Sequence, residues 1–254
     1  DIAKEAKNQF TKQGLKIHLD TKVTAVKSNT SALCLTYLKD DNETEKEFDR
    51  VIVAVGRKPH IDNLFSIDSG ITLDESGRIN VDDKCQTSIP RVYAIGDCVR
   101  GPMLAHKGSE EGVMVAELIA GDIAEVNYDI IPSVIYTSPE IAWTGKNEME
   151  LEEASVDYKI GLFPFAASGR AKVMNQSSGM VKIISSKEND QILGVHIIGP
   201  MAGELIGEVV LAMEFEASTE DLQRTIHAHP SLSEAIHEAA LAADNRALNF
   251  PNKK

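Results

Sequence analysis

The sequence lacks several features that would place it at once in a class of protein. No apolar run approaches the ~20 residues that a membrane-spanning helix needs, and the first residues do not resemble a signal peptide. Basic residues are in the minority, with Lys+Arg 26 against Asp+Glu 39 and a net charge of −13. They form no stripe that could replace the counterions of a nucleic acid. We therefore expect a cytoplasmic protein that binds neither membranes nor nucleic acids.

Cysteine is scarce as well. Cys34, Cys85 and Cys98 are odd in number and far apart, which fits reduced thiols and argues against a secreted disulfide framework. No C-x-x-C or C-x4-C pair occurs, nor any G-x-G-x-x-G turn of the kind that cradles dinucleotide phosphates. His227 and His229 could be two metal ligands, but no third ligand has a convincing spacing, so we expect no metal site.

The first part of the chain, residues 1–58, predicts a short amphipathic helix that ends at Gly14, followed by strands over 16–19, 22–27, 32–38 and 48–55. The core of the last strand, 51–55, is apolar throughout, as in strands that are buried on both faces of a parallel sheet. Gly56 follows it, where a ligand could approach the backbone closely. An ordinary turn is the alternative.

Residues 59–131 predict a strand over 91–95 that ends in Gly96 and Asp97. Asp97 could accept hydrogen bonds from the hydroxyls of a sugar-like ligand, although a Gly-Asp pair is usually a turn. A helix is expected to open at residues 103–106 and to end at Gly121. The free amides at its start could stabilise negative charge on a ligand, and a plain packing helix is the alternative.

From residue 132 onward, strands are expected over 133–137, 159–163, 180–185 and 192–198, with helices over 147–154, 200–215 and 235–247. Gly199, Gly203 and Gly207 are spaced by four, which would let a neighbouring element pack against the backbone. Strands with helices gathered on one side give an α+β layer. The whole chain is therefore predicted to combine α/β and α+β parts.

The most informative stretch is residues 227–238, near the end of the chain. Pro230 disfavours a helical conformation for His229, so His229 is expected on an extended loop before the last helix. Glu234 could reach back to one ring nitrogen, fix the tautomer and leave the other nitrogen as a general base. Alternatively, Ser231-x-x-Glu234 is a capping box in which Glu234 has no contact with the imidazole.

Three motifs resemble those of the flavin disulfide reductases, most closely the dihydrolipoamide dehydrogenases. They are the run His-Ala-His-Pro-Ser-Leu-Ser-Glu-Ala from residue 227, Val-Ala-Val-Gly-Arg-Lys-Pro from residue 53, and Ala-Ile-Gly-Asp-Cys from residue 94 followed by Met-Leu-Ala-His. The resemblance implies that His229 is the acid/base for a substrate thiol and Glu234 its partner. It further implies an NAD contact at Gly56, a contact of Asp97 with the ribityl hydroxyls of FAD, and an isoalloxazine lining by Met103, Leu104, Ala105 and His106.

The resemblance also implies a domain organisation. Residues 1–58 would be the C-terminal part of a Rossmann-like NAD domain, 59–131 the C-terminal part of an FAD domain, and 132–254 an interface domain that forms a homodimer. The complete enzyme would oxidise dihydrolipoyl groups with NAD+, and its partners would be the lipoyl domains and E2 component of 2-oxoacid dehydrogenase complexes.

Because neither a redox cysteine pair nor a phosphate turn is present, we expect the chain alone to bind little or no FAD and to be inactive. Three alternatives stay open. The chain could be part of glutathione reductase, part of a soluble transhydrogenase, or a dimerisation piece without chemistry of its own.

Overall fold

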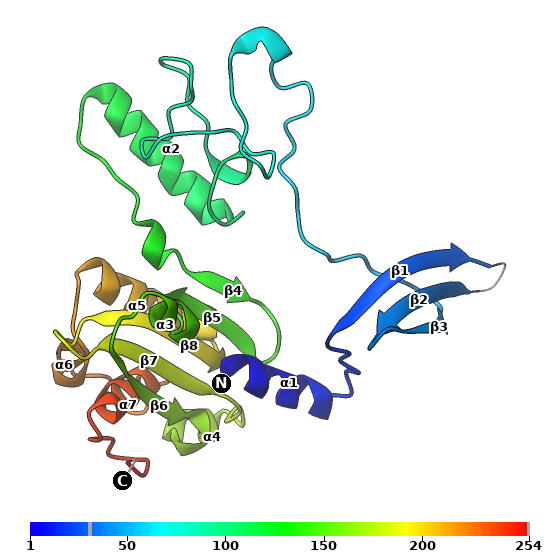
Figure 1. Cartoon of the computed structure of the whole chain (residues 1–254). Helices are drawn as coiled ribbons and strands as arrows, with labels where there is room; N and C mark the ends of the chain where they lie inside the picture. Colours follow the sequence, from blue (N-terminus) through cyan, green and yellow to red (C-terminus); the bar gives the residue numbers. More distant parts are fainter. Residues whose placement is uncertain (30–31, 253–254) are drawn as a thin grey trace. The chain divides into compact units, whose positions relative to one another are not determined.

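The computed structural model describes residues 1–29 and 32–252 and divides them into two compact units. One unit is Phe10–Lys58, and the other combines Asp1–Gln9 with Pro59–Lys254. Helix α1 (Ile2–Lys12) begins the chain, and Gly14 follows it in a left-handed conformation with φ +97°. The predicted first helix and its end are therefore confirmed (Figure 1).

The unit Phe10–Lys58 is an antiparallel meander with strand order β1-β2-β3. Its strands are β1 (Thr21–Ser28), β2 (Leu33–Lys39) and β3 (Asn42–Phe48). Asp40 and Asp41 make the tight turn between β2 and β3, both with positive φ. Strand β3 was not predicted, because every one of its side chains is exposed and its sequence therefore lacks an apolar period.

Two other strands that the sequence predicts in this unit are absent from the described residues. Residues 16–19 are irregular, and residues 48–55 form no strand beyond the end of β3 at Phe48. The side chains of Ile52 and Val55 are 90% and 92% exposed. A strand of a parallel sheet needs hydrogen-bonded neighbours on both sides, and the described part of the chain offers none to this run.

Residues 59–131 contain little regular structure apart from one long helix. The elements are η1 (Ile67–Ser69), η2 (Gly96–Cys98), α2 (Ala105–Ala120) and η3 (Tyr128–Ile130). Helix α2 ends at Gly121 in a left-handed conformation, as expected. The predicted strand at 91–95 is wrong, because only a single bridge, between Gln86 and Tyr93, forms there.

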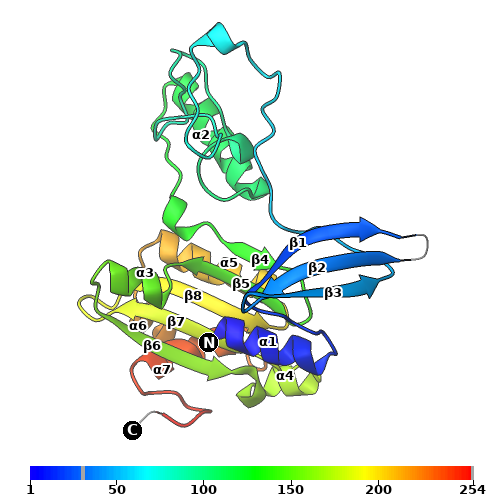
Figure 2. The same ribbon diagram turned by 45° about the vertical axis from the view of Figure 1, so that its right-hand side comes forward.

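The remaining residues form a five-stranded antiparallel sheet with the order β4-β5-β8-β7-β6 (Figure 2). Its strands are β4 (Ser133–Ile135), β5 (Glu140–Gly145), β6 (Tyr158–Pro164), β7 (Met180–Ser186) and β8 (Ile192–Gly199). The helices are α3 (Glu148–Glu153), α4 (Gly169–Val173), α5 (Ala202–Glu214), α6 (Thr219–Arg224) and α7 (Glu234–Ala243). Strand β5 and helices α4 and α6 were not predicted, since their sequences show no clear apolar period.

Helices α5 and α7 bury their apolar sides in one core with the sheet. Val181 of β7, Val195 of β8, Val209 of α5 and Ala239 of α7 are all fully buried in this cluster. Close approach of α7 depends on Gly161 of β6, where an added Cβ would lie only 1.9 Å from the carbonyl oxygen of Ala239. The helices therefore share one face of the sheet, as the α+β prediction requires.

The glycine series at spacing four is only partly explained by packing. A Cβ on Gly199 would lie 2.2 Å from the Phe165 ring, and one on Gly203 would lie 3.2 Å from Val134. Gly207 has no atom within 4 Å of such a Cβ and is exposed. The expected close approach therefore holds for the first two glycines only.

Candidate functional site

His229 and Glu234 face each other at the start of α7. The Nδ1 atom of His229 lies 2.8 Å from Oε1 of Glu234, and the two side chains are 80% and 28% exposed. A carboxylate oxygen can only accept, so Nδ1 carries the proton, and in the neutral ring Nε2 keeps its lone pair. No described residue bonds Nε2. The geometry is that of an oriented imidazole base open to solvent.

Glu234 serves the helix start at the same time. Its Oε2 accepts the backbone N–H of Ser231 at 2.7 Å, and Ser231 Oγ accepts the backbone N–H of Glu234 at 3.3 Å. The reciprocal Ser231–Glu234 bonds of the capping-box alternative and the imidazole contact therefore occur together through different oxygens. They lie in the turn before α7, whose own N-cap, Ser233, makes no side-chain cap bond. Partial burial of Glu234 opposes ionisation, but the hydrogen bonds from Ser231 and His229 outweigh it and lower the pKa of this carboxyl group.

His227 has contacts that sequence reasoning missed, since it considered the ring only as a possible metal ligand and rejected that role. Nε2 of His227 lies 2.6 Å from a carboxylate oxygen of Glu208, and Nδ1 lies 3.0 Å from the carbonyl oxygen of Thr225. Its side chain is only 6% exposed. No group of three or more His, Cys, Asp or Glu side chains suited to a metal occurs among the described residues.

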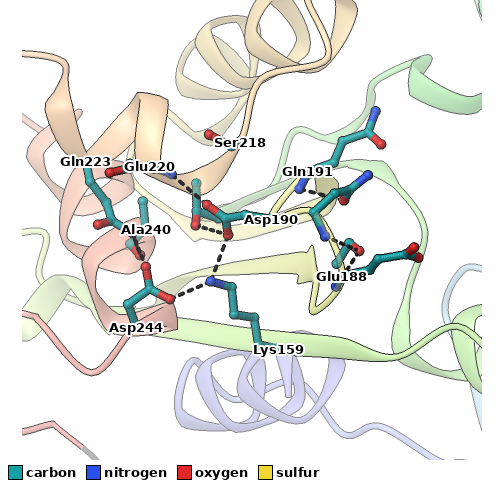
Figure 3. A network of polar contacts seen from close by, with 12 residues as sticks. Lys159, Glu188, Asp190, Gln191, Ser218, Glu220, Gln223, Ala240 and Asp244 are labelled. Carbon is teal, nitrogen blue, oxygen red and sulfur yellow. Dashed lines mark hydrogen bonds and ion pairs between the residues drawn. The ribbon is translucent and has the colours of Figure 1, made fainter.

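The far end of α7 is tied to the sheet by a second polar network (Figure 3). Lys159 of β6 forms ion pairs with Asp244 and, at 2.8 Å, with Asp190. Gln223 of α6 donates to Asp244 at 2.8 Å and to the carbonyl of Ala240 at 3.1 Å. Helix α7 is thus held at its end as well as at its start, which fixes the element that carries Glu234.

The two segments expected to contact the flavin lie side by side. The η2 turn that contains Asp97 packs on the first turns of α2, where a Cβ on Gly108 would lie 3.1 Å from the Cα of Gly96. Helix α2 starts after Leu104 without a side-chain cap and has no acidic residue in its first turn. Its first amides therefore keep their hydrogen-bonding capacity and the positive end of the helix dipole.

A buried ion pair that sequence reasoning missed holds these segments together. Lys107 and Glu111 lie 3.2 Å apart with fully buried side chains. Lys107 Nζ donates to the carbonyl of Gly96 at 2.9 Å, and Glu111 accepts the N–H of Gly96 at 2.7 Å. The spacing of four predicts such a pair on a helix, but the sequence gives no sign that it is buried.

Tyr128 completes the environment of this pair. Its hydroxyl donates to Glu111 at 2.8 Å and lies 3.7 Å from the sulfur of Cys85. Burial, followed by the hydrogen bond to Glu111, raises the pKa of the Tyr128 phenol. The hydroxyl therefore stays protonated and remains a donor to the carboxylate.

Two of the predicted cofactor contacts have less support. The ring of His106 is engaged through Nε2, which lies 2.8 Å from the carbonyl oxygen of Pro132. Gly56 has φ +105° and lies on an exposed irregular segment. This segment does not form the strand that the sequence predicts before Gly56, and an NAD contact at Gly56 stays a prediction.

Comparison with known proteins agrees with this arrangement. Residues 131–240 match the profile of the pyridine nucleotide-disulphide oxidoreductase dimerisation domain, and residues 1–112 match that of pyridine nucleotide-disulphide oxidoreductases. The chain belongs to the pyridine nucleotide-disulphide oxidoreductases. The match accounts for the resemblance of the three motifs, and the chain carries the dimerisation domain of this family.

Curated relatives include dihydrolipoyl dehydrogenases of several organisms. That of Cupriavidus necator is 50% identical over 98% of this chain and 53% of its own length. The mitochondrial proteins of Caenorhabditis elegans and Homo sapiens are each 46% identical, over 96% and 98% of this chain and 50% of their own lengths. The chain spans about half the length of the curated relatives it matches.

Solved structures share the fold. LpdA of Mycobacterium tuberculosis aligns with a TM-score of 0.83 and 24% identity, over 92% of this chain and 51% of its own. The Cu(II) complex of the HOCl-induced flavoprotein disulfide reductase RclA of Escherichia coli aligns with a TM-score of 0.85 and 24% identity, over 94% and 54%. In the described part of the chain, no helix is both long and apolar enough to cross a membrane.

Proposed function

We propose that the chain supplies the acid/base, part of the flavin site and the dimer interface of a dihydrolipoyl dehydrogenase. The observation that carries the proposal is the 2.8 Å contact between His229 Nδ1 and Glu234, with Nε2 exposed. The names of the curated relatives support the choice of substrate class. The proposed division is an NAD part at 1–58, an FAD part at 59–131 and an interface part at 132–254.

In this proposal Nε2 of His229 takes the proton from one thiol of a dihydrolipoyl group. The thiolate attacks a disulfide that the rest of the enzyme provides, so that an S–S bond breaks, a mixed disulfide forms and one enzyme sulfur leaves as thiolate. Attack by the second substrate thiol releases lipoyl disulfide and leaves the enzyme with two reduced sulfurs. Glu234 orients the ring and stabilises the imidazolium that forms.

The flavin end of an FAD site fits the residues at the start of α2. Asp97 would hold the ribityl hydroxyls, and residues 103–106 would line the isoalloxazine, with the uncapped amides of α2 facing its pyrimidine side. When bound, FAD supplies the two-electron step that passes a hydride to NAD+. The chain has no G-x-G-x-x-G turn to hold the phosphates, so tight binding needs the remaining half.

The dimerisation domain supports a homodimer in which the base of one chain serves the site of its partner. Lipoyl domains and the E2 component of 2-oxoacid dehydrogenase complexes are the proposed partners. The relatives include bacterial and mitochondrial proteins, and a cytoplasmic location remains our proposal. As a second candidate, the chain on its own is a dimerisation piece, because its three cysteines are free and form no pair.

The role of His229 is tested by replacing it with Gln in the enzyme assembled from this chain and the half that the relatives carry. Loss of a general base lowers the rate of thiol oxidation by about 10²- to 10⁴-fold, while the FAD content of the enzyme should stay unchanged. The control is His18→Gln, since His18 is exposed and lies far in sequence from Gly56, from Asp97 and residues 103–106, and from His229. Activity of the His229 variant within a few-fold of the parent would refute the assigned role.

A further inference from the structure

We propose that His227 is a positioning residue, held as an imidazolium between two acceptors so that the loop carrying His229 is fixed to α5. The inference rests on the proposed function of His229 as the base. It starts from the two hydrogen bonds of one ring, 3.0 Å from Nδ1 to the carbonyl of Thr225 and 2.6 Å from Nε2 to Glu208.

Neither partner of the His227 ring brings a proton of its own. A carbonyl oxygen only accepts, so Nδ1 must donate to Thr225, and an ionised carboxylate only accepts, so Nε2 must donate to Glu208. A neutral imidazole has a single N–H and could satisfy one of these bonds only. The Glu208 side chain is 32% exposed, whereas the ring is 6% exposed. The proton therefore belongs on the imidazole.

The other titratable groups near the ring are compatible with this charge. His237 of α7 stacks on His227 with ring centroids 5.1 Å apart and planes at 29°. Nε2 of His237 lies 3.0 Å from the carbonyl of Gln223, so it is a donor and the ring can remain neutral. The pKa of Glu234 is lowered by hydrogen bonds from Ser231 and His229 and, to a smaller extent, by the charge of His227. His229 is the remaining titratable neighbour on the loop.

The charged ring joins three elements around the base. His227 belongs to the loop, Glu208 to α5 and His237 to α7, and the loop runs only two residues further to His229. His229 itself is mostly exposed and has one side-chain partner, Glu234. The His227 contacts therefore restrict where the backbone of residue 229 can lie, and they do so only while His227 is protonated.

The test is carried out on this chain with ¹⁵N-labelled histidine, using NMR to observe the protons on each ring nitrogen. At pH 7 the parent should show His227 with both nitrogens protonated and His229 as the Nδ1–H tautomer. Glu208→Gln should remove one N–H from His227 and mix the tautomers of His229, whereas Glu208→Asp should retain the doubly protonated ring. The control is Glu220→Gln, since Glu220 pairs only with the exposed Arg224 of its own helix among side chains.

A singly protonated His227 in the parent at pH 7 would overturn the inference, and so would an unchanged His229 tautomer in Glu208→Gln. In the assembled enzyme, Glu208→Gln should lower kcat by up to about a hundredfold through misplacement of the base, and Glu208→Asp should recover most of it. The ring signals do not depend on catalysis, so they separate failure of the anchor from failure of the role proposed for His229.

Discussion

The buried pair Lys107–Glu111 yields a prediction whose magnitude can be worked out from the structure. Lys107→Met removes the cation and leaves the Glu111 carboxylate fully buried with two donors, the N–H of Gly96 and the hydroxyl of Tyr128. Breaking one side of a buried pair costs about 3–5 kcal/mol. The two remaining donors place this variant at the lower end, about 3 kcal/mol.

The assay should observe individual residues, because the chain has two compact units and no single free energy of unfolding describes it. We expect the amide of Gly96 to exchange with solvent roughly 100-fold faster in Lys107→Met, the factor that corresponds to about 3 kcal/mol. Protonation of the unpaired carboxylate relieves its desolvation, so the deficit should shrink as the pH is lowered. Lys172→Met on the exposed side of α4 is the matched control.

Exchange of Gly96 within threefold of the parent would refute this reasoning. It would mean that the η2 turn, which places Asp97 beside α2, is held by backbone packing at Gly108 and not by the ion pair. A uniform increase across the whole chain would also contradict it, since the contacts of Lys107 and Glu111 are confined to residues 96–128.

Two further predictions concern the sheet domain. Burial, with a smaller effect of Lys182, lowers the pKa of His196 from 6.5 to about 4. As the pH falls, the unfolded chain therefore binds this proton at a higher pH than the folded chain. The free energy of unfolding should decrease between pH 6.5 and 4, by at most about 3 kcal/mol. The measurement is urea unfolding followed by the fluorescence of Trp143, which is paired with His196 across β5 and β8. The loss should occur in the parent and not in His196→Leu. Equal pH dependence of the two proteins would contradict the prediction. Gly161→Ala should destabilise the domain by about 1–3 kcal/mol because its Cβ meets the backbone of α7. Gly207→Ala should instead stabilise α5 by about 0.5–1 kcal/mol. Similar melting temperatures for the two variants would refute both assignments.

Features that depend on neighbouring residues could be predicted from the sequence. Gly121 ends α2 as expected, the helix expected over 147–154 occurs as α3, and the strands expected over 180–185 and 192–198 match β7 and β8 within one residue. The contact between His229 and Glu234 was also within reach, since the two residues are five apart and Pro230 limits the geometry between them.

Features that depend on distant partners could not be predicted. The run 51–55 has the composition of a buried strand, yet its state depends on strands that must lie beside it. Lys107 and Glu111 would be taken for a surface pair, because nothing local reveals that Tyr128 and Gly96 close over them. The bond from His227 to Glu208 spans 19 residues and two helices, and the sequence gives such a pair no special spacing.

The shared carboxylate at the start of α7 has a consequence for partly folded chains. One oxygen of Glu234 closes the turn that leads into the helix and the other aligns the imidazole. When that turn frays, the ring is released together with it, so that a nascent or damaged chain presents an ordinary surface histidine. The thiol activation that we propose for His229 therefore requires that the last helix has formed.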